Sequence, residues 1–445
     1  MKQTEHAAPE PRPVTHRAIL AIAVPIMISG VSTPLLGVVD TGVVGQTPDP
    51  AYIGAVALGA LVFNFVFWAF GFLRMGTTGL TAQASGAGDP AEIRASLGRA
   101  VLIAVVVGIG LVALQWPIRE LAFALIQGSP KVQGLACDYY DIRIWAAPAT
   151  LTNYAVLGWF IGLARARVAL LLQLVLNLTN MALDAFFVLS LDMGVKGVAL
   201  GTVCAEVVAA AVGLALATQH LRGFAGGWDF ARLMAADRIR RTIAVNRDIM
   251  IRSLALIVAF AWFTTQGARQ GDAVLAANAV LMQFITVAAY FLDGLAFSAE
   301  ALVGKAVGAS HRAGLSAAAR MTTWWAAAIA LLASVIFALL GPAIVDMLTV
   351  DPAVRAIAHD NLPWVVGAPL AAVWAFQLDG IFIGATRTAQ MRNAMLMSLL
   401  IFLCAWWILS PLGNSGLWAA LYVLYGARTV TLLYYFPALV RSVPA

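Results

Sequence analysis

Apolar segments of membrane-spanning length alternate with short polar loops along the whole chain. A helix needs about 20 apolar residues to cross the hydrocarbon core of a bilayer. Because lipid offers no hydrogen bonds to the backbone, spanning segments must be helices or strands of a closed barrel, and no alternating strand-length pattern appears. We therefore expect about twelve helical spans. They are predicted at residues 18–44, 52–76, 95–115, 138–163, 168–190, 195–220, 243–268, 274–302, 317–341, 358–384, 391–411 and 415–438.

The composition agrees with a membrane protein. Of the 445 residues, 61% are hydrophobic and 11% are charged, and the mean hydropathy is +0.86. In a soluble domain, about a quarter of all residues are charged. The three cysteines and five histidines are scattered, so neither a disulfide framework nor a zinc site is expected.

The net charge of +6 resides mainly in loops on one side of the predicted spans. That side holds the N-terminal tail, Arg94 and Arg99, Arg165 and Arg167, Arg222 through Arg252, Lys305 to Arg320, and Arg387 with Arg392. The opposite loops hold Arg119, Lys131, Arg143, Lys196, Arg269 and Arg355. The positive-inside rule therefore predicts that both termini are cytoplasmic, and it accounts for the basic residues without a nucleic-acid partner.

The second half of the chain repeats the first at a displacement of 222 residues. Residues 158–165 match 380–387 in five of eight positions, and at the same displacement 83–87 align with 305–309. Because the same displacement aligns segments that lie far apart in the chain, it indicates a duplication. Six spans in each half give both halves the same orientation, which is typical of transporters that rock around a central site.

The repeat and the loops divide the chain into four parts. We expect a disordered tail at 1–17, a first lobe at 18–220, a cytoplasmic linker at 221–242 and a second lobe at 243–440. Within the linker, Trp228–Arg241 mixes apolar and basic residues. That pattern is typical of a helix at the membrane surface, although a solvated linker fits the composition equally well.

Ionisable and amide side chains form one polar cluster in the first half. Asp40 lies in the first span, Asn177, Asn180 and Asp184 share one face of the fifth, and Thr202 lies early in the sixth. A charged residue in a span costs about 2.5–3.5 kcal/mol on insertion scales, so each needs a reason. Oxygen ligands suit a small cation, and two neighbouring carboxylates suit a proton.

The duplication serves as a control for this cluster. A purely structural polar pair is expected in both halves, whereas the second half carries apolar residues at the matching positions. The asymmetry favours function over a structural pair, and the alternative for Asp40 is an interfacial acid near the outer end of a long span. The second-half counterparts of Asp40, Asn177, Asn180 and Asp184 are Trp262, Leu399, Phe402 and Trp406.

Other charges inside the predicted spans have simpler explanations. Glu206 and Arg428 lie near mid-membrane in different halves, and each is a candidate for a structural ion-pair partner. Interfacial solvation is the default for residues nearer the cytoplasmic ends, although a secondary proton or substrate role is open for two of them, Asp293 and Asp379. This group near the ends consists of Arg74, Asp293, Glu300 and Asp379.

Several long motifs resemble one transporter family. The segments Phe72–Gln83, Glu300–Gly304 and Asp379–Arg387, and the first-span pattern from Pro25 to Gly45, resemble the DinF branch of the multidrug and toxic compound extrusion (MATE) family. The similarity runs over about residues 15–440. It implies an all-α integral membrane protein of the bacterial inner membrane, with twelve helices in two six-helix lobes arranged as a V.

The resemblance also implies an activity and its site. Members of the family export organic cations in exchange for protons or sodium ions, so we expect small cationic or amphipathic substrates, no covalent cofactor and a monomer in the bilayer. Asp40, Asn180, Asp184 and Thr202 match the family's coupling site, where H⁺ or Na⁺ is expected to bind. Pro25 matches a proline associated with bending of the first span. Some relatives also carry acids on spans 7 and 10. Here the apolar body of span 7 carries no acid, although Asp379 lies on span 10.

Three other functions remain as alternatives. A flippase for lipid-linked or oligosaccharide cargo would favour a large basic cavity, and the second lobe offers few central basic residues beyond Arg428. An intramembrane enzyme would need a metal cluster, a nucleophile elbow or a phosphate loop, and the sequence supports none of these. A channel is disfavoured by the two-lobe repeat.

Overall fold

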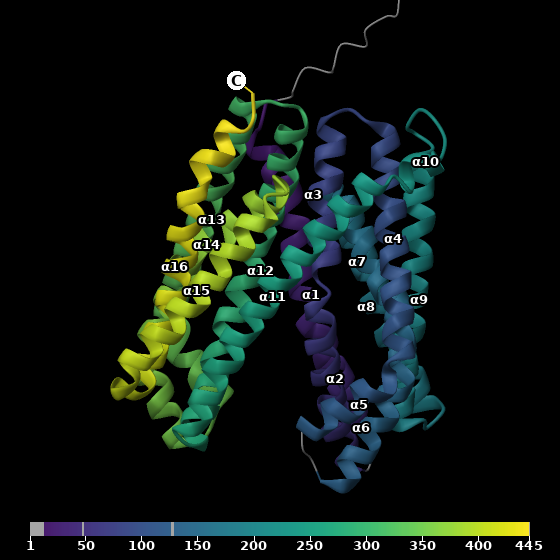
Figure 1. Ribbon diagram of the computed structural model, residues 1–445. Helices are drawn as coiled ribbons and strands as arrows, with labels where there is room; N and C mark the ends of the chain where they lie inside the picture. The colour runs from purple at the N-terminus through teal and green to yellow at the C-terminus, as the bar shows by residue number, and fades with distance from the viewer. Residues whose placement is uncertain (1–12, 47–48, 126–128, 445) are drawn as a thin grey trace, which may run out of the picture. The chain divides into compact units, whose positions relative to one another are not determined.

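The computed structural model describes residues 13–46, 49–125 and 129–444, and this part of the chain is helical without a strand (Figure 1). Most of the tail predicted at 1–17 lies outside the described residues. The elements of the first half are α1 (His16–Gly45), α2 (Ala51–Ala69), α3 (Phe72–Gly86), α4 (Pro90–Ala113), α5 (Gln115–Leu125), α6 (Pro130–Arg143), η1 (Ile144–Ala146), α7 (Ala147–Gly162), α8 (Ala166–Ala185), η2 (Phe186–Ser190) and α9 (Gly194–Leu221).

The linker and the second half contribute the remaining helices. These are α10 (Phe230–Leu233), α11 (Ala236–Arg269), α12 (Asp272–Gly308), α13 (Arg312–Leu348), α14 (Pro352–Gly384), α15 (Thr388–Leu409), η3 (Ser410–Leu412) and α16 (Gly413–Arg441). Each predicted span lies within these helices. The span predicted at 52–76 runs through α2 and α3, and the one at 138–163 runs through α6, η1 and α7.

Eight helical stretches of the described chain are long and apolar enough to cross a membrane. Three of them join neighbouring elements: α2 with α3, α8 with η2, and α15 with α16 through η3. The chain is therefore a multi-pass membrane protein, as the hydropathy pattern predicts.

Contacts group the helices into two compact units. Unit 1 contains the described residues up to Met27, Ala82–Gly88 and the residues from Ala244 onward. Unit 2 contains Ile28–Thr81 and Asp89–Ile243. Helices α1, α3 and α11 thus each contribute residues to both units.

The core of unit 1 is packed by aromatic and aliphatic side chains from α11, α12, α14, α15 and α16. Phe263, Phe402 and Trp418 are each at most 2% exposed. The indole N–H of Trp418 donates to Oδ1 of Asn278 at 3.0 Å, so the ring buries its apolar body while its polar atom is satisfied.

The backbone confirms the duplication at the displacement of 222. Gly158 packs so closely on the carbonyl oxygen of Arg74 that a Cβ would overlap with it, and Gly380 packs in the same way on Ala296. These two contacts occupy equivalent positions of the two halves. Only glycine lets helix backbones approach so closely, which explains why the repeat retains glycine at both places.

Two pairs of equivalent turns adopt the same left-handed backbone conformation. Ala164 has a φ of 60° and its counterpart Thr386 a φ of 52°. Gly88 and its counterpart Ser310 have φ values of 63° and 53°. The turns that end α3 and α12, and those that end α7 and α14, are therefore copies of each other, even where the residue type has changed.

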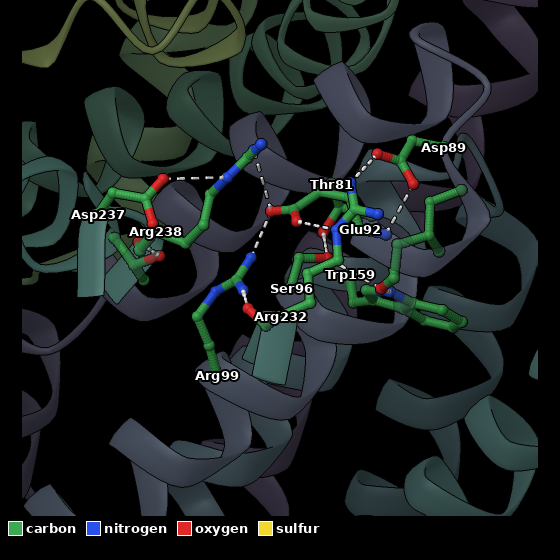
Figure 2. A network of polar contacts seen from close by, with 11 residues as sticks. Thr81, Asp89, Glu92, Ser96, Arg99, Trp159, Arg232, Asp237 and Arg238 are labelled. Carbon is green, nitrogen blue, oxygen red and sulfur yellow. Dashed lines mark hydrogen bonds and ion pairs between the residues drawn. The ribbon is translucent and has the colours of Figure 1, made fainter. Parts of the chain in front are cut away.

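In unit 2, the linker is anchored on α4 by charged side chains (Figure 2). Arg232 of α10 forms ion pairs with Asp89 and Glu92, and Arg99 pairs with Glu92 and donates to the backbone oxygen of Arg232 at 3.2 Å. Arg94 adds three hydrogen bonds to linker carbonyls. The linker segment around α10 is therefore a docked element of unit 2.

We predict that Gly380→Ala destabilises the protein. The new methyl group would overlap with the Ala296 carbonyl oxygen, and overpacking of this kind costs about 1–3 kcal/mol. The measurement is the half-life of the detergent-solubilised protein on heating, followed by size-exclusion chromatography. Gly426→Ala on α16 is the control, because a Cβ there has no atom within 4 Å. Equal half-lives for the two variants would contradict the packing argument.

Candidate functional site

The polar stripe of α8 faces the interior of unit 2. Asn177, Asn180 and Asp184 recur at helical spacing, and they are 3%, 2% and 0% exposed. The buried face of α8 continues from this stripe to Ala166, Ala169 and Leu172, whereas Leu171 and Leu178 on the other side are exposed. The burial of all three side chains means that each needs a polar partner.

Asp184 faces Asp40 of α1. Their carboxyl groups lie within hydrogen-bonding reach of each other. Neither oxygen of Asp184, nor Oδ1 of Asp40, has a well-formed hydrogen bond from any donor in the described part of the chain. Two groups that are acceptors when ionised thus meet in a buried place, and this contact becomes favourable only when a proton or another cation joins them.

Asn180 and Thr202 complete the cluster. Nδ2 of Asn180 donates to Oγ1 of Thr202 at 3.3 Å, and the Thr202 hydroxyl donates to the Val198 carbonyl at 3.0 Å. Asn180 also interacts with the carboxylate of Asp184. The structure therefore brings together the four residues predicted from the sequence, and they come from α1, α8 and α9.

Asn177 has a different environment from the other residues of the stripe. Its Nδ2 donates to Oγ of Ser32 at 2.9 Å, and its Oδ1 accepts from Nε2 of Gln173 at 3.0 Å. Both ends of the amide are thus satisfied by protein groups. Asn177 thus contacts α1 at Ser32, whereas Asp184 contacts α1 at Asp40.

Gly201 of α9 determines how closely Asp184 can approach that helix. A Cβ at this position would overlap with Oδ1 of Asp184. The missing side chain therefore provides the space that the carboxyl group occupies. No pattern in the sequence indicates this role, since single glycines are common in apolar spans and only the neighbouring side chain reveals what the glycine does.

A cation that the sequence analysis assigned to a loop lies beside the acidic pair. Nη1 of Arg143 donates to the hydroxyl of Tyr139 at 2.6 Å, and the guanidinium stacks 4.8 Å from the ring centre of Phe63. The charge of Arg143 acts on both Asp40 and Asp184. We grouped Arg143 with the loop residues although the span predicted at 138–163 contains it; it is the last residue of α6, and its guanidinium packs on the rings of Phe63 and Tyr139 in unit 2.

Glu206 of α9 belongs to the same polar interior. Asn153 of α7 donates to Oε2 of Glu206 at 2.7 Å and to its backbone oxygen at 3.0 Å. The charge of Arg143 acts on Glu206 as well. Glu206, which we expected to form an ion pair, thus has an amide as its direct partner.

Unit 1 fills the equivalent helix contact with aromatic rings. Trp262 of α11 and Trp406 of α15 pack edge to face, with ring centres 5.2 Å apart and planes at 86°. These residues are the counterparts of Asp40 and Asp184. The two halves therefore retain one helix–helix contact and differ in the chemistry placed there.

The second-half acids lie in separate environments. Asp379 of α14 forms ion pairs with Arg252 and Arg428, so it is not solvated at an interface as we expected. Arg428 is an ion-pair partner, as predicted. Asp293 is half-buried on α12, and α1 continues as a helix through Pro25.

Comparison with known proteins identifies the chain. The sequence model of the family described as MatE matches residues 25–186 and again residues 249–408. This chain belongs to the MATE family, in its DinF branch. The double match also confirms the internal duplication. MATE proteins are membrane transporters, so the intramembrane enzyme is excluded.

Named relatives and solved structures agree with this assignment. The chain is 40% identical to the DNA damage-inducible protein F of Escherichia coli (strain K12) over 94% of this chain and 91% of the relative. It is 26% identical to a probable multidrug resistance protein NorM of Rhizobium meliloti (strain 1021), over 97% and 95% of the two chains. An outward-facing multidrug resistance MATE transporter shares the fold, with a TM-score of 0.85 at 19% identity and 95% coverage of both chains.

We predict that Gly201→Ala lowers transport by about tenfold, because a displacement of the Asp184 carboxyl group that costs about 1.4 kcal/mol would have that effect. The measurement is uptake of a cationic dye into proteoliposomes. Alanine also favours the helix by about 1 kcal/mol, so the loss should occur in protein of normal yield. Gly110→Ala on α4, where a Cβ has no atom within 4 Å, serves as control. Unchanged uptake by Gly201→Ala would show that Asp184 tolerates the displacement.

Proposed function

We propose that this MATE protein exports organic cations from the bacterial cytoplasm in exchange for protons, with Asp40 and Asp184 as the shared site. In this proposal it lies in the inner membrane with both termini in the cytoplasm, in line with the charge asymmetry of its loops. The likeness to proteins named for multidrug resistance supports a broad range of small organic substrates.

The observation that carries the proposal is the contact between the two carboxyl groups. Both Asp184 oxygens and Oδ1 of Asp40 are buried and receive no well-formed hydrogen bond from a donor among the described residues. One proton can bridge two carboxyl oxygens within hydrogen-bonding reach. An Na⁺ ion placed between them would have to separate them and recruit further oxygens. The geometry therefore favours a proton as the coupling ion.

The same pair serves a cationic substrate when the proton has left. Two buried carboxylates then lie close together, and their mutual repulsion is relieved by a bound organic cation. Proton binding removes the charge that holds the substrate, so the two ligands exclude each other. Exchange follows from competition for one pair of charges.

The neighbouring residues limit how the pair can respond. Arg143 supplies a fixed positive charge, Gly201 leaves room for Asp184, and Asn180 with Thr202 orients the carboxylate. Asp40 lies on α1, which also carries Pro25. Protonation can shift the transporter between its states only by favouring one state over the other, and a change in how α1 packs on α8 at the pair is the proposed difference.

We predict that Asp40→Asn and Asp184→Asn each reduce proton-driven dye uptake to about a tenth or less, because an amide can neither release a proton nor attract a cation. Purified protein is placed in liposomes with an acidic interior, the membrane potential is clamped with potassium and valinomycin, and uptake of rhodamine 123 is recorded. Glu120→Gln is the control, since Glu120 is exposed on α5 with 63% of its side chain accessible.

A parallel series with a sodium gradient and no pH gradient separates the two ions. Uptake driven by sodium alone would transfer the coupling role to Na⁺ at the same residues. Normal uptake by both amide variants would remove the carboxyl pair from the mechanism.

A further inference from the structure

The linker connects two helices that each contain a predicted span. Helix α9 ends at Leu221 and α11 begins at Ala236, so residues 222–235 join the ends of these spans in one short segment. Such a segment either extends into water or lies along the bilayer surface. The contacts that the linker makes with α4 distinguish the two arrangements.

The linker touches α4 at residues inside the third predicted span. A Cβ on Gly98 would lie 2.5 Å from Cδ1 of Leu233 and 3.1 Å from Cζ3 of Trp228, so both side chains lie against the backbone of α4. The backbone oxygen of Arg232 accepts a hydrogen bond from Arg99 at 3.2 Å. At about 1.5 Å per residue, these contacts lie about 5 Å inside the predicted start of the span. The linker is therefore at the boundary between lipid headgroups and hydrocarbon.

Three large apolar side chains of the linker face outward at this boundary. Phe230 is 72% exposed, Met234 is 56% exposed and Trp228 is 49% exposed. Leu233 instead packs inward on Gly98. Aromatic side chains are enriched at membrane interfaces, where one part of the ring contacts acyl chains and another contacts water. At this depth the lipid itself is the apolar partner of the three exposed side chains.

The arginines of the linker region serve two different purposes. Arg232 forms ion pairs with Asp89 and Glu92 of α4, and these contacts hold the linker in place (Figure 2). Arg222 and Arg240 are exposed, and neither forms an ion pair with a described residue. Their charges are therefore available to a group outside the protein.

The two acids of the same region are engaged within it. Oδ1 of Asp229 accepts a hydrogen bond from the backbone N–H of Arg232 at 3.0 Å, and Asp237 lies 3.5 Å from the guanidinium of Arg238. Residues 222–241 contain five arginines and two aspartates. The exposed surface thus combines apolar side chains with an excess of positive charge, which complements an anionic lipid headgroup.

We propose that the linker binds the anionic phospholipids of the leaflet that it contacts. Trp228, Phe230 and Met234 lie among the acyl chains, and Arg222 and Arg240 bind the lipid phosphates through charge-assisted hydrogen bonds. In the topology proposed above, this leaflet is the cytoplasmic one. The inference does not depend on which ion or substrate the protein exchanges.

Lipids with brominated acyl chains test this inference, because bromine quenches a fluorophore that it contacts. The three native cysteines are replaced by alanine, and Phe230→Cys or Met234→Cys provides a single thiol for a bimane label. The purified full-length protein is placed in vesicles of phosphatidylcholine and phosphatidylglycerol, in which only one of the two lipids is brominated. The ratio of the two quenching signals measures the preference for the anionic lipid at the labelled position.

We predict that both lipids quench the two probes and that phosphatidylglycerol is preferred. Arg222→Gln and Arg240→Gln should each lower this preference by about fivefold, which corresponds to about 1 kcal/mol for one basic residue at an anionic surface. The labelled positions are exposed, so the variants should elute from a size-exclusion column as the unlabelled protein does.

Two controls separate the linker from the rest of the surface. Val106→Cys places the probe at the middle of the span on α4, where the side chain is 61% exposed, and both lipids should quench it equally. Arg320→Gln removes an exposed charge from α13 and should leave the preference at residue 230 unchanged.

The remaining outcomes would overturn the inference. Quenching at residue 106 but not at residues 230 and 234 would place the linker in water. Equal quenching by the two lipids at residue 230 would show insertion without recognition of the anionic headgroup. An equal loss of preference in Arg320→Gln would assign the effect to overall charge. The assay involves no transport, so dye uptake by the same protein tests the proposed function separately.

Discussion

The contact between the carboxyl groups of Asp40 and Asp184 is the interaction on which the proposed exchange depends. Two groups that accept hydrogen bonds when ionised are placed together, and no donor among the described residues makes a well-formed hydrogen bond to the Asp184 oxygens or to Oδ1 of Asp40. When both carboxyl groups are ionised their charges repel each other, so a proton or another cation favours the contact.

The surrounding residues keep this pair close without satisfying it. Gly201 lacks the Cβ that would overlap with Oδ1 of Asp184, and Arg143 packs on aromatic rings at a position where its charge acts on both acids. A direct salt bridge would have neutralised one carboxylate permanently. A cation held nearby moderates the repulsion while leaving both groups able to exchange ligands.

The duplication shows how one scaffold can carry two kinds of interior. The helix contact that holds the carboxyl pair in unit 2 holds Trp262 and Trp406 in unit 1, where the rings pack into a hydrophobic core. A second equivalent position carries Glu206 in one half and Arg428 in the other. The backbone turns and the close glycine contacts are retained in both halves, so the scaffold was preserved while the charges diverged.

The sequence by itself determined the features that are local to one helix or repeated along the chain: the apolar spans, the polar face of α8 and the displacement of 222 residues. Tertiary structure alone decided which side chains meet. We grouped Arg143 and Arg252 with the loop residues although both lie within predicted spans. A long side chain of this kind reaches either the interface or the interior, and only the packing of the helices decides which of the two it reaches. The partners of Asp379 come from α11 and α16, and no periodicity within one helix encodes a contact between helices so far apart in sequence.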